Sequence, residues 1–137
     1  KHRVTMPSHP LVRGFDERFY APHSRKTTVN IDDVRSVQTL DVLADSERAG
    51  IYLAADHDMR RIFVTGHPEY DYDTLKNEYF RDLSRGLSPK IPENYFPYDN
   101  PENRPVNFWK GHANLLYGNW LNYFVYQRTP FDLADLK

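Results

Sequence analysis

The sequence of 137 residues contains no cysteine. It can therefore form no disulfide and no metal site built on thiolates, which is typical of a cytoplasmic protein. No apolar run approaches the roughly 20 residues that a membrane-spanning helix needs. The opening residues 1–6 are not followed by the apolar segment of a signal peptide. We therefore expect a cytoplasmic protein that does not enter a membrane.

An excess of charge of one sign is also lacking. The 18 lysines and arginines oppose 19 aspartates and glutamates, which gives a formal net charge of −1 at pH 7. Because phosphate binding normally requires a basic excess or patch, nucleic acid is not an expected partner. The sequence has no HExxH or CxxC motif and no glycine-rich phosphate loop, so we expect neither a metal nor a bound cofactor. The length suits a single domain over residues 1–137.

The first half of the chain predicts loops followed by strands. Prolines interrupt the segment up to about Asn30, which we expect to be loop-like. Residues 30–35 then predict a short helical turn that is opened by a capping Asn or Asp. Three apolar segments follow, and the charged links between them suit hairpin turns, so we expect an antiparallel meander of strands. These segments are residues 36–44, 50–55 and 61–65.

The second half predicts two main helices. Asp71 is a candidate N-cap for a helix over residues 72–85, which ends at Gly86. A second helix over residues 106–127 ends at Pro130 and carries large apolar side chains at helical spacing, which we assign to the core. These side chains are Trp109, Ala113, Leu116, Trp120 and Tyr123. A meander combined with two helices indicates an α/β fold.

The strongest candidate for chemistry is His67, which follows the apolar strand and Gly66 directly. Glu69 comes two residues later, and Pro68 between them restricts the backbone. A histidine at the end of a strand, with a carboxylate able to orient it, is the base half of a nucleophile–base–acid site. If the nucleophile is a thiol, it lies outside these residues. The alternative is that His67 and Glu69 form a surface or packing pair.

Two further residues are candidates for binding rather than for proton transfer. Arg81 lies on the first predicted helix and could bind a substrate carboxylate through its forked guanidinium, although a helical arginine is more often a solvated charge. Ser24 lies between His23 and Arg25, where a serine more often forms hydrogen bonds within a loop. His112, on the second helix, is expected at the polar edge of a packed helix.

Several segments together resemble homoserine O-acyltransferases of the homoserine O-succinyltransferase type. The segments are residues 13–16, 21–25, 63–71, 79–82, 94–97 and 119–127, followed by Thr129-Pro130. The resemblance covers nearly the whole chain. The His-Pro-Glu sequence alone also resembles the broader class I glutamine amidotransferase pattern, so it is the combination of segments that specifies the family.

The resemblance implies a fold, a reaction and residue roles. The fold is the C-terminal portion of a flavodoxin-like, class I glutamine amidotransferase-like three-layer sandwich. Enzymes of the family transfer a succinyl or acetyl group from acyl-CoA to the hydroxyl of L-homoserine in methionine biosynthesis, through a cysteine acyl-enzyme. By the same resemblance, His67 and Glu69 are catalytic and Ser24 and Arg81 bind substrate. Acyl-CoA is then a co-substrate, and no further cofactor is expected.

The chain departs from the family pattern because it begins at what corresponds to the middle of the family's enzymes. We therefore expect the N-terminal portion of the same enzyme to be a partner that supplies the cysteine, and the isolated chain to have no acyltransferase turnover. A sheet that is cut partway exposes strand edges, which also favours a homodimer. Two alternatives remain: a glutamine amidotransferase-type fragment that hydrolyses glutamine, and a non-catalytic fragment that binds another chain.

Overall fold

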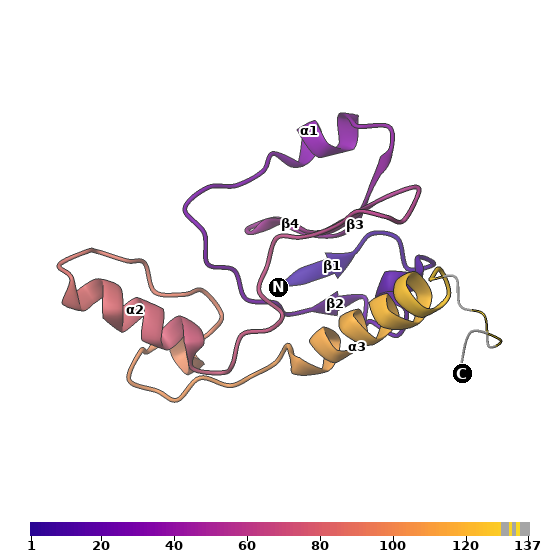
Figure 1. Ribbon diagram of the computed structural model, residues 1–137. Helices are drawn as coiled ribbons and strands as arrows, with labels where there is room; N and C mark the ends of the chain where they lie inside the picture. Colours follow the sequence, from indigo (N-terminus) through magenta and orange to yellow (C-terminus); the bar gives the residue numbers. More distant parts are fainter. Residues whose placement is uncertain (130–131, 133, 135–137) are drawn as a thin grey trace.

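The computed structural model of the protein describes residues 1–129, 132 and 134, and contains one sheet with helices on both of its faces (Figure 1). The five strands are all antiparallel, in the order β2-β1-β3-β4-β5. They are β1 (His2–Val4), β2 (Arg18–Phe19), β3 (Leu40–Ser46), β4 (Gly50–Asp56) and β5 (Ile62–Val64). The α/β class is confirmed.

The predicted antiparallel meander is confirmed as β3, β4 and β5. Both faces of its two long strands are covered, which explains why residues 42–44 and 51–55 are apolar. On one face, helix α1 (Ile31–Ser36) packs against Val42, Ile51 and Ala54. On the other face, helix α3 (Lys110–Trp120) and its π-helical continuation η3 (Leu121–Tyr126) cover the larger core. The buried members of that core are Leu11, Val12, Phe19, Leu43, Ala44, Tyr52, Leu53, Ala55, Leu116 and Phe124.

The prediction that the first 30 residues form loops is wrong at two places, where β1 and β2 extend the sheet. These strands are three and two residues long, too short for an alternating apolar pattern to be visible. Pairing with β3 fixes β1, and the Arg3 Nε donates to the buried carboxylate of Asp45 at 2.8 Å. The expected helical turn, in contrast, is confirmed as α1, with the Asn30 side chain accepting from the Asp32 amide at 3.0 Å.

The first predicted helix is confirmed as α2 (Thr74–Ser84). Its N-cap is Asp73 rather than Asp71, because Asp71 contributes its backbone carbonyl to the preceding turn and accepts from the Thr74 amide at 3.2 Å. The helix ends at Gly86 as predicted. That glycine has a φ of +73°, and the Leu87 amide reaches back to the Asp82 carbonyl at 3.0 Å, which is the Schellman arrangement.

The second predicted helix begins at Lys110 rather than at Val106. The Asn107 side chain accepts from the amides of Trp109 and Lys110, at 3.1 and 3.0 Å, and so caps the helix from outside. The helix continues through η3 to Tyr126, which agrees with the predicted extent to about Gln127, whereas Pro130 lies outside the described residues. The prediction that the large apolar side chains of this helix lie in the core is correct only in part, since Trp120 is 42% exposed. Its ring lies opposite β5, a short strand that is too narrow to cover it.

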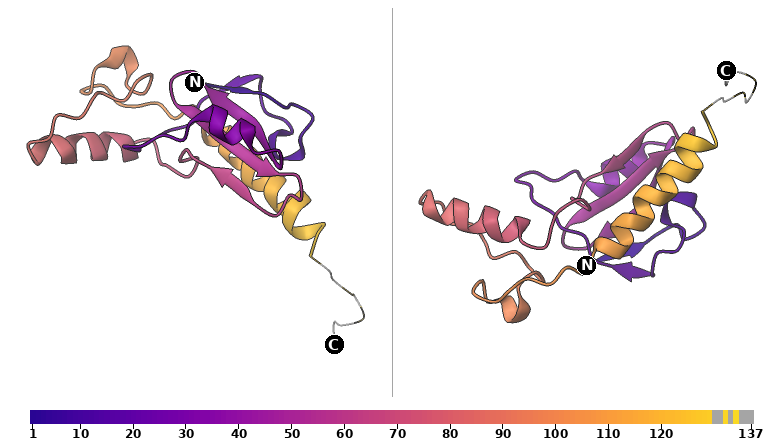
Figure 2. Two further views of the ribbon diagram at one scale, coloured as in Figure 1. Left: turned by 90° about the horizontal axis from the view of Figure 1, so that it is seen from above. Right: turned by 60° about the horizontal axis from the view of Figure 1, so that its bottom comes forward.

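Helix α2 projects from the layered part of the molecule (Figure 2). It has a small core of its own, formed by Leu75, Tyr95, Phe96 and Trp109, with Tyr70 packed against it. The Trp109 indole donates to the Tyr70 carbonyl at 2.9 Å, which ties this second core to the start of α3. The segment just after β5 therefore lies between the two cores.

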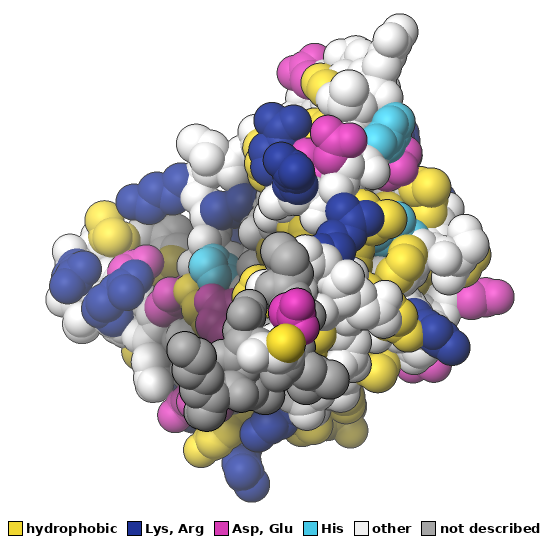
Figure 3. All heavy atoms as spheres, turned by 45° about the vertical axis from the view of Figure 1, so that its right-hand side comes forward, with side chains coloured by type: hydrophobic (Ala, Val, Ile, Leu, Met, Phe, Trp, Pro, Cys, Tyr) yellow, Lys and Arg dark blue, Asp and Glu magenta, His cyan; other side chains and the backbone are white. Residues whose placement is uncertain are grey.

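The surface carries charges of both signs. On the face shown in Figure 3, basic and acidic side chains lie side by side over several elements. Within residues 1–129, 132 and 134, no helix combines the length and apolar character needed to cross a membrane.

Candidate active site

The chain leaves β5 and turns through Gly66 to reach His67 at the edge of the sheet. Gly66 has no room for a side chain, because a Cβ atom there would lie 2.9 Å from both the Pro22 carbonyl oxygen and the Tyr52 ring. The next amide, that of His67, donates to the Pro22 carbonyl at 2.8 Å. Strand β4 and the loop at Pro22 therefore fix the backbone immediately before and at the histidine.

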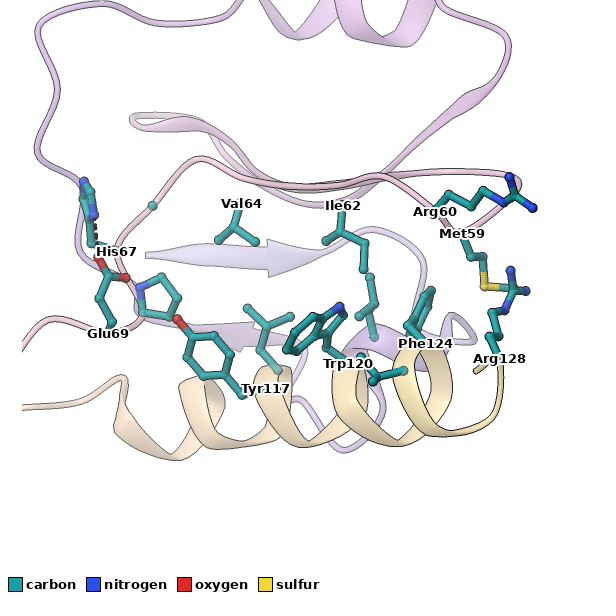
Figure 4. A pocket seen from close by; sticks show the side chains of 15 residues that line it. Met59, Arg60, Ile62, Val64, His67, Glu69, Tyr117, Trp120, Phe124 and Arg128 are labelled. Atoms are coloured by element: carbon teal, nitrogen blue, oxygen red, sulfur yellow. Dashed lines mark hydrogen bonds and ion pairs between the residues drawn. The ribbon is translucent and has the colours of Figure 1, made fainter. Parts of the chain in front are cut away.

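The His67 side chain is held by two neighbours from its own loop. Its Nδ1 lies 2.8 Å from the Glu69 Oε1, and its ring stacks on Tyr70 with centroids 4.3 Å apart and planes at 13° (Figure 4). The side chains of His67 and Glu69 are 34% and 54% exposed, so the pair is accessible. When Nδ1 donates to the carboxylate, Nε2 of the neutral ring is the proton acceptor. The arrangement suits a general base.

A groove of about 1070 Å³ runs from this pair along β5 and the helix formed by α3 and η3. His67 and Glu69 lie at one end, and Arg60 and Arg128 lie at the other (Figure 4). Apolar side chains line the length between them. They include Ile62 and Val64 from the strand side, and Leu116, Trp120 and Phe124 from the helix side.

The other two predicted site residues, Ser24 and Arg81, line a different hollow of about 750 Å³. Arg81 projects from α2, and its Nε lies 2.9 Å from the Asp82 carboxylate. The cationic side chains of Arg25, Lys26 and Lys90 share the lining. The structure thus brings the four predicted residues together in two pairs, not in one cavity. With four cationic and two acidic side chains, the lining keeps a positive excess, which suits an anionic ligand.

Tyr70 connects the two hollows and was not predicted from the sequence. Its ring stacks on His67, and its hydroxyl donates to the Glu78 Oε1 at 3.0 Å on α2. Glu78 lines the hollow that contains Ser24 and Arg81. Burial, followed by the contact with Glu78, raises the pKa of Tyr70, and a hydrogen bond from Ser24 opposes this rise. The only available signal was the position of Tyr70 between His67 and the start of α2.

A buried histidine, His2, and a half-buried one, His23, lie behind the site and were also not assigned from the sequence. His2 Nε2 lies 2.8 Å from His23 Nε2, and the His23 residue precedes Ser24 directly. His112 lies only partly at the predicted polar edge: its Nε2 is 3.2 Å from the Asp16 carboxylate, but its ring also packs against Phe15 and Phe19. Among the residues that the structure describes, no group of three or more potential ligands could hold a metal ion.

Comparison with known proteins gives a consistent set of relatives. The family model described as homoserine O-succinyltransferase matches residues 1–131. A homoserine O-acetyltransferase from Acetivibrio thermocellus is 57% identical, over 99% of this chain and 45% of that protein. A homoserine O-succinyltransferase from Vibrio vulnificus is 54% identical, over 96% of this chain and 42% of that protein. The chain therefore spans less than half the length of these curated relatives.

Proposed function

The chain belongs to the homoserine O-succinyltransferase family, and we propose from this premise that it supplies the base and the homoserine-binding residues of a homoserine O-acyltransferase of methionine biosynthesis. The acyl donor is acetyl-CoA or succinyl-CoA, since relatives of similar identity carry both names. Residues 1–137 are then part of one catalytic domain. The bond between His67 and Glu69 beside a groove is the observation that carries the proposal.

In the proposed reaction His67 serves as base in both half-reactions. It takes the proton of a cysteine thiol, the thiolate attacks the thioester carbonyl, and coenzyme A leaves with that proton. His67 then takes the proton of the homoserine hydroxyl, whose oxygen attacks the acyl-enzyme and releases the cysteine. Glu69 orients the ring by accepting from Nδ1 and stabilises the imidazolium that forms in each half-reaction.

The proposed homoserine site lies in the hollow of Ser24 and Arg81. Arg81 pairs with the substrate carboxylate through its guanidinium, in place of its present contact with Asp82. Ser24 binds a polar group of the same substrate. Tyr70 supports this assignment, because its hydroxyl bonds to Glu78 in the hollow while its ring stacks on His67.

The proposed nucleophile is a cysteine in the N-terminal portion of the same enzyme, which covers the groove. Two observations support this partner. Within the described residues, β5 pairs with β4 alone, so its outer edge can accept another strand. Large apolar side chains, including Phe63 on β5 and Trp120 on α3, are exposed beside that edge. With the added strands, the antiparallel sheet becomes one part of a flavodoxin-like, class I glutamine amidotransferase-like three-layer sandwich.

Reconstitution tests the proposal directly. The chain is produced together with the N-terminal portion of the Acetivibrio thermocellus relative, and acyl transfer to homoserine is measured with acetyl-CoA and with succinyl-CoA. We expect transfer by the pair, none by the chain alone, and a mass increase of one acyl group on a cysteine when homoserine is omitted. A matched pair with His67→Ala should lose both signals, whereas His57→Ala, on an exposed hairpin turn, should keep them.

Two results would contradict the proposal. Transfer by the chain alone would remove the need for a partner, and ammonia release from glutamine by the pair would favour the glutamine amidotransferase alternative. If the pair forms but neither reaction occurs, the non-catalytic alternative is favoured. The homodimer and the cytoplasmic location stay predictions, and the mass of the purified assembly tests the first of them.

A further inference from the structure

The buried His2 and the half-buried His23 form a close pair of imidazole rings. His2, on β1, is 2% exposed, and its Nε2 lies 2.8 Å from the His23 Nε2. The two rings are nearly parallel, with centroids 4.9 Å apart and planes at 17°. His2 also contacts the rings of Phe19 and Tyr52, with centroids at 5.4 and 5.1 Å.

The contact between two Nε2 atoms restricts the protonation of the pair. One ring must donate from Nε2, and the other must accept there, so the two rings cannot both be imidazolium ions. Burial, followed by the charge of the partner ring, lowers the pKa of His2 to about 3. Burial, followed by the charge of Arg25, lowers the pKa of His23 to about 4. Both rings are therefore neutral at pH 7.

The pair contains buried polar atoms that lower the stability of the fold, and packing alone does not explain their presence. The Nδ1 atoms of His2 and His23 are both buried, and neither has a hydrogen-bond partner among the described residues. One of them is a donor and the other an acceptor, since the two tautomers are opposite. A buried polar atom without a partner destabilises a protein, so two apolar rings would serve the core better.

Two sets of contacts connect the histidine pair to His67. His23 follows Pro22, whose carbonyl accepts the His67 amide at 2.8 Å. His2 packs on Tyr52, whose ring lies 2.9 Å from where a Cβ of Gly66, the residue before His67, would lie. Both sets are backbone or ring contacts that place the His67 main chain.

From these contacts we propose that His2 and His23 form a neutral imidazole pair that positions His67 by holding the Pro22 carbonyl in place. The pair is a positioning device and does not touch the reacting atoms. It fixes where the loop crosses the end of β5, and it thereby sets the direction in which the His67 ring leaves the sheet. The effect of the pair on catalysis rests on the proposed function, whereas its effect on the position of the His67 main chain does not.

Hydrogen exchange at the His67 amide tests the mechanical step without any assay of transfer. In the purified protein with its partner portion bound, His2→Phe keeps a ring against Phe19 and Tyr52 but removes the Nε2 contact. We expect the His67 amide to exchange about tenfold faster, while the Asp56 amide, bonded to the Arg61 carbonyl at 3.0 Å, is unchanged. His2→Gln puts an amide group near the position of Nε2 and should restore slow exchange.

The controls separate positioning from general destabilisation. Unchanged exchange at His67 in His2→Phe overturns the proposal, and so does equal acceleration at His67 and Asp56 that His2→Gln does not reverse. If His2→Phe does not fold, the same comparison is made between His23→Phe and His23→Gln. In the reconstituted enzyme, His2→Phe should lower kcat about tenfold, with His2→Gln close to the parent. Altered exchange in a protein that has no transfer activity would uphold the pair and reject the proposed function.

Discussion

His67 Nδ1 and Glu69 Oε1 lie 2.8 Å apart, and this contact fixes which nitrogen of the ring faces the proposed reaction. The carboxylate accepts from Nδ1, which leaves Nε2 to take and return a proton. The charge of Glu69 also favours the imidazolium that forms transiently. Both effects depend on a contact between exposed side chains, so substitution can separate them without disturbing the core.

We predict that Glu69→Gln lowers kcat and that His67→Ala lowers it further. The amide oxygen of glutamine can still accept from Nδ1, but it lacks the charge, and we expect a loss of about 100-fold. Removal of the base should cost roughly 1,000-fold to 10,000-fold. The release of coenzyme A by the reconstituted enzyme measures both. An equal effect of the two substitutions would mean that Glu69 does more than orient and stabilise the ring.

Substitution of Arg81 should affect homoserine but not the acyl donor. We expect Arg81→Ala to raise the KM for homoserine at least tenfold, because a charged hydrogen bond to the substrate carboxylate is lost. The burst of coenzyme A released in the absence of homoserine should be unchanged. Arg85→Ala, at the exposed end of the same helix, is the matched control. Loss of the burst in Arg81→Ala would show that its assignment to homoserine is wrong.

Local sequence patterns predicted those parts of the fold that depend on near neighbours. The capped helical turn over residues 30–35 and the end of α2 at Gly86 are set within a few residues, and each was correct. The strands β1 and β2 were missed because their place in the sheet is decided by pairing partners far along the chain, such as Asp45 for Arg3. The exposure of Trp120 was missed for a similar reason, since helical spacing shows a face but not what covers it.

The sequence likewise predicted only those parts of the candidate site that depend on near neighbours in the chain. The proximity of His67 and Glu69 follows from their spacing around one proline, and the sequence therefore suggested it. That Ser24 and Arg81 line a separate hollow could not be predicted, because α2 and the loop at Ser24 meet only in three dimensions. Tyr70, which links the two hollows, belongs to a type of residue that is common in cores, and only its contacts distinguish it.

The close packing at Gly66 gives a prediction about stability. In Gly66→Ala the new methyl group would lie 2.9 Å from the Pro22 carbonyl oxygen and the Tyr52 ring, neither of which can move away easily. We expect the free energy of unfolding to fall by about 1 to 3 kcal/mol, with a displaced His67. Gly118→Ala in α3 is the control, since nothing lies within 4 Å of the added atom there.

Chemical denaturation of the purified protein measures both glycine substitutions. The control should be neutral or should stabilise the protein by up to about 1 kcal/mol, because alanine is the better helix former. If Gly66→Ala were as stable as Gly118→Ala, the turn before His67 would have to be looser than the structure describes. A decrease in stability that appears in both would point to the protein's general intolerance of substitution.

The buried imidazole pair predicts a loss of stability in mild acid. The pKa values of His2 and His23 are lowered to about 3 and about 4, whereas an unfolded histidine titrates near 6.5. Between these limits the unfolded chain binds more protons than the folded one, so the free energy of unfolding rises with pH and falls on acidification. Each ring contributes a slope of at most about 1.4 kcal/mol per pH unit, which begins below pH 6.5.

The substitution His2→Gln should remove part of this slope, because glutamine does not titrate. The measurement is the midpoint of urea unfolding at intervals from pH 7 to pH 4.5. The hydrogen bonds from Arg61 lower the pKa of Asp56 from its ordinary value of 3.8. Asp56 therefore contributes little to the slope between pH 7 and pH 4.5. As the pH falls, we expect the parent to lose stability steadily and His2→Gln to lose less, with the two curves nearly parallel close to pH 7. Equal slopes would mean that His2 titrates alike in the folded and the unfolded chain, which its burial and the repulsion by a charged His23 ring both oppose.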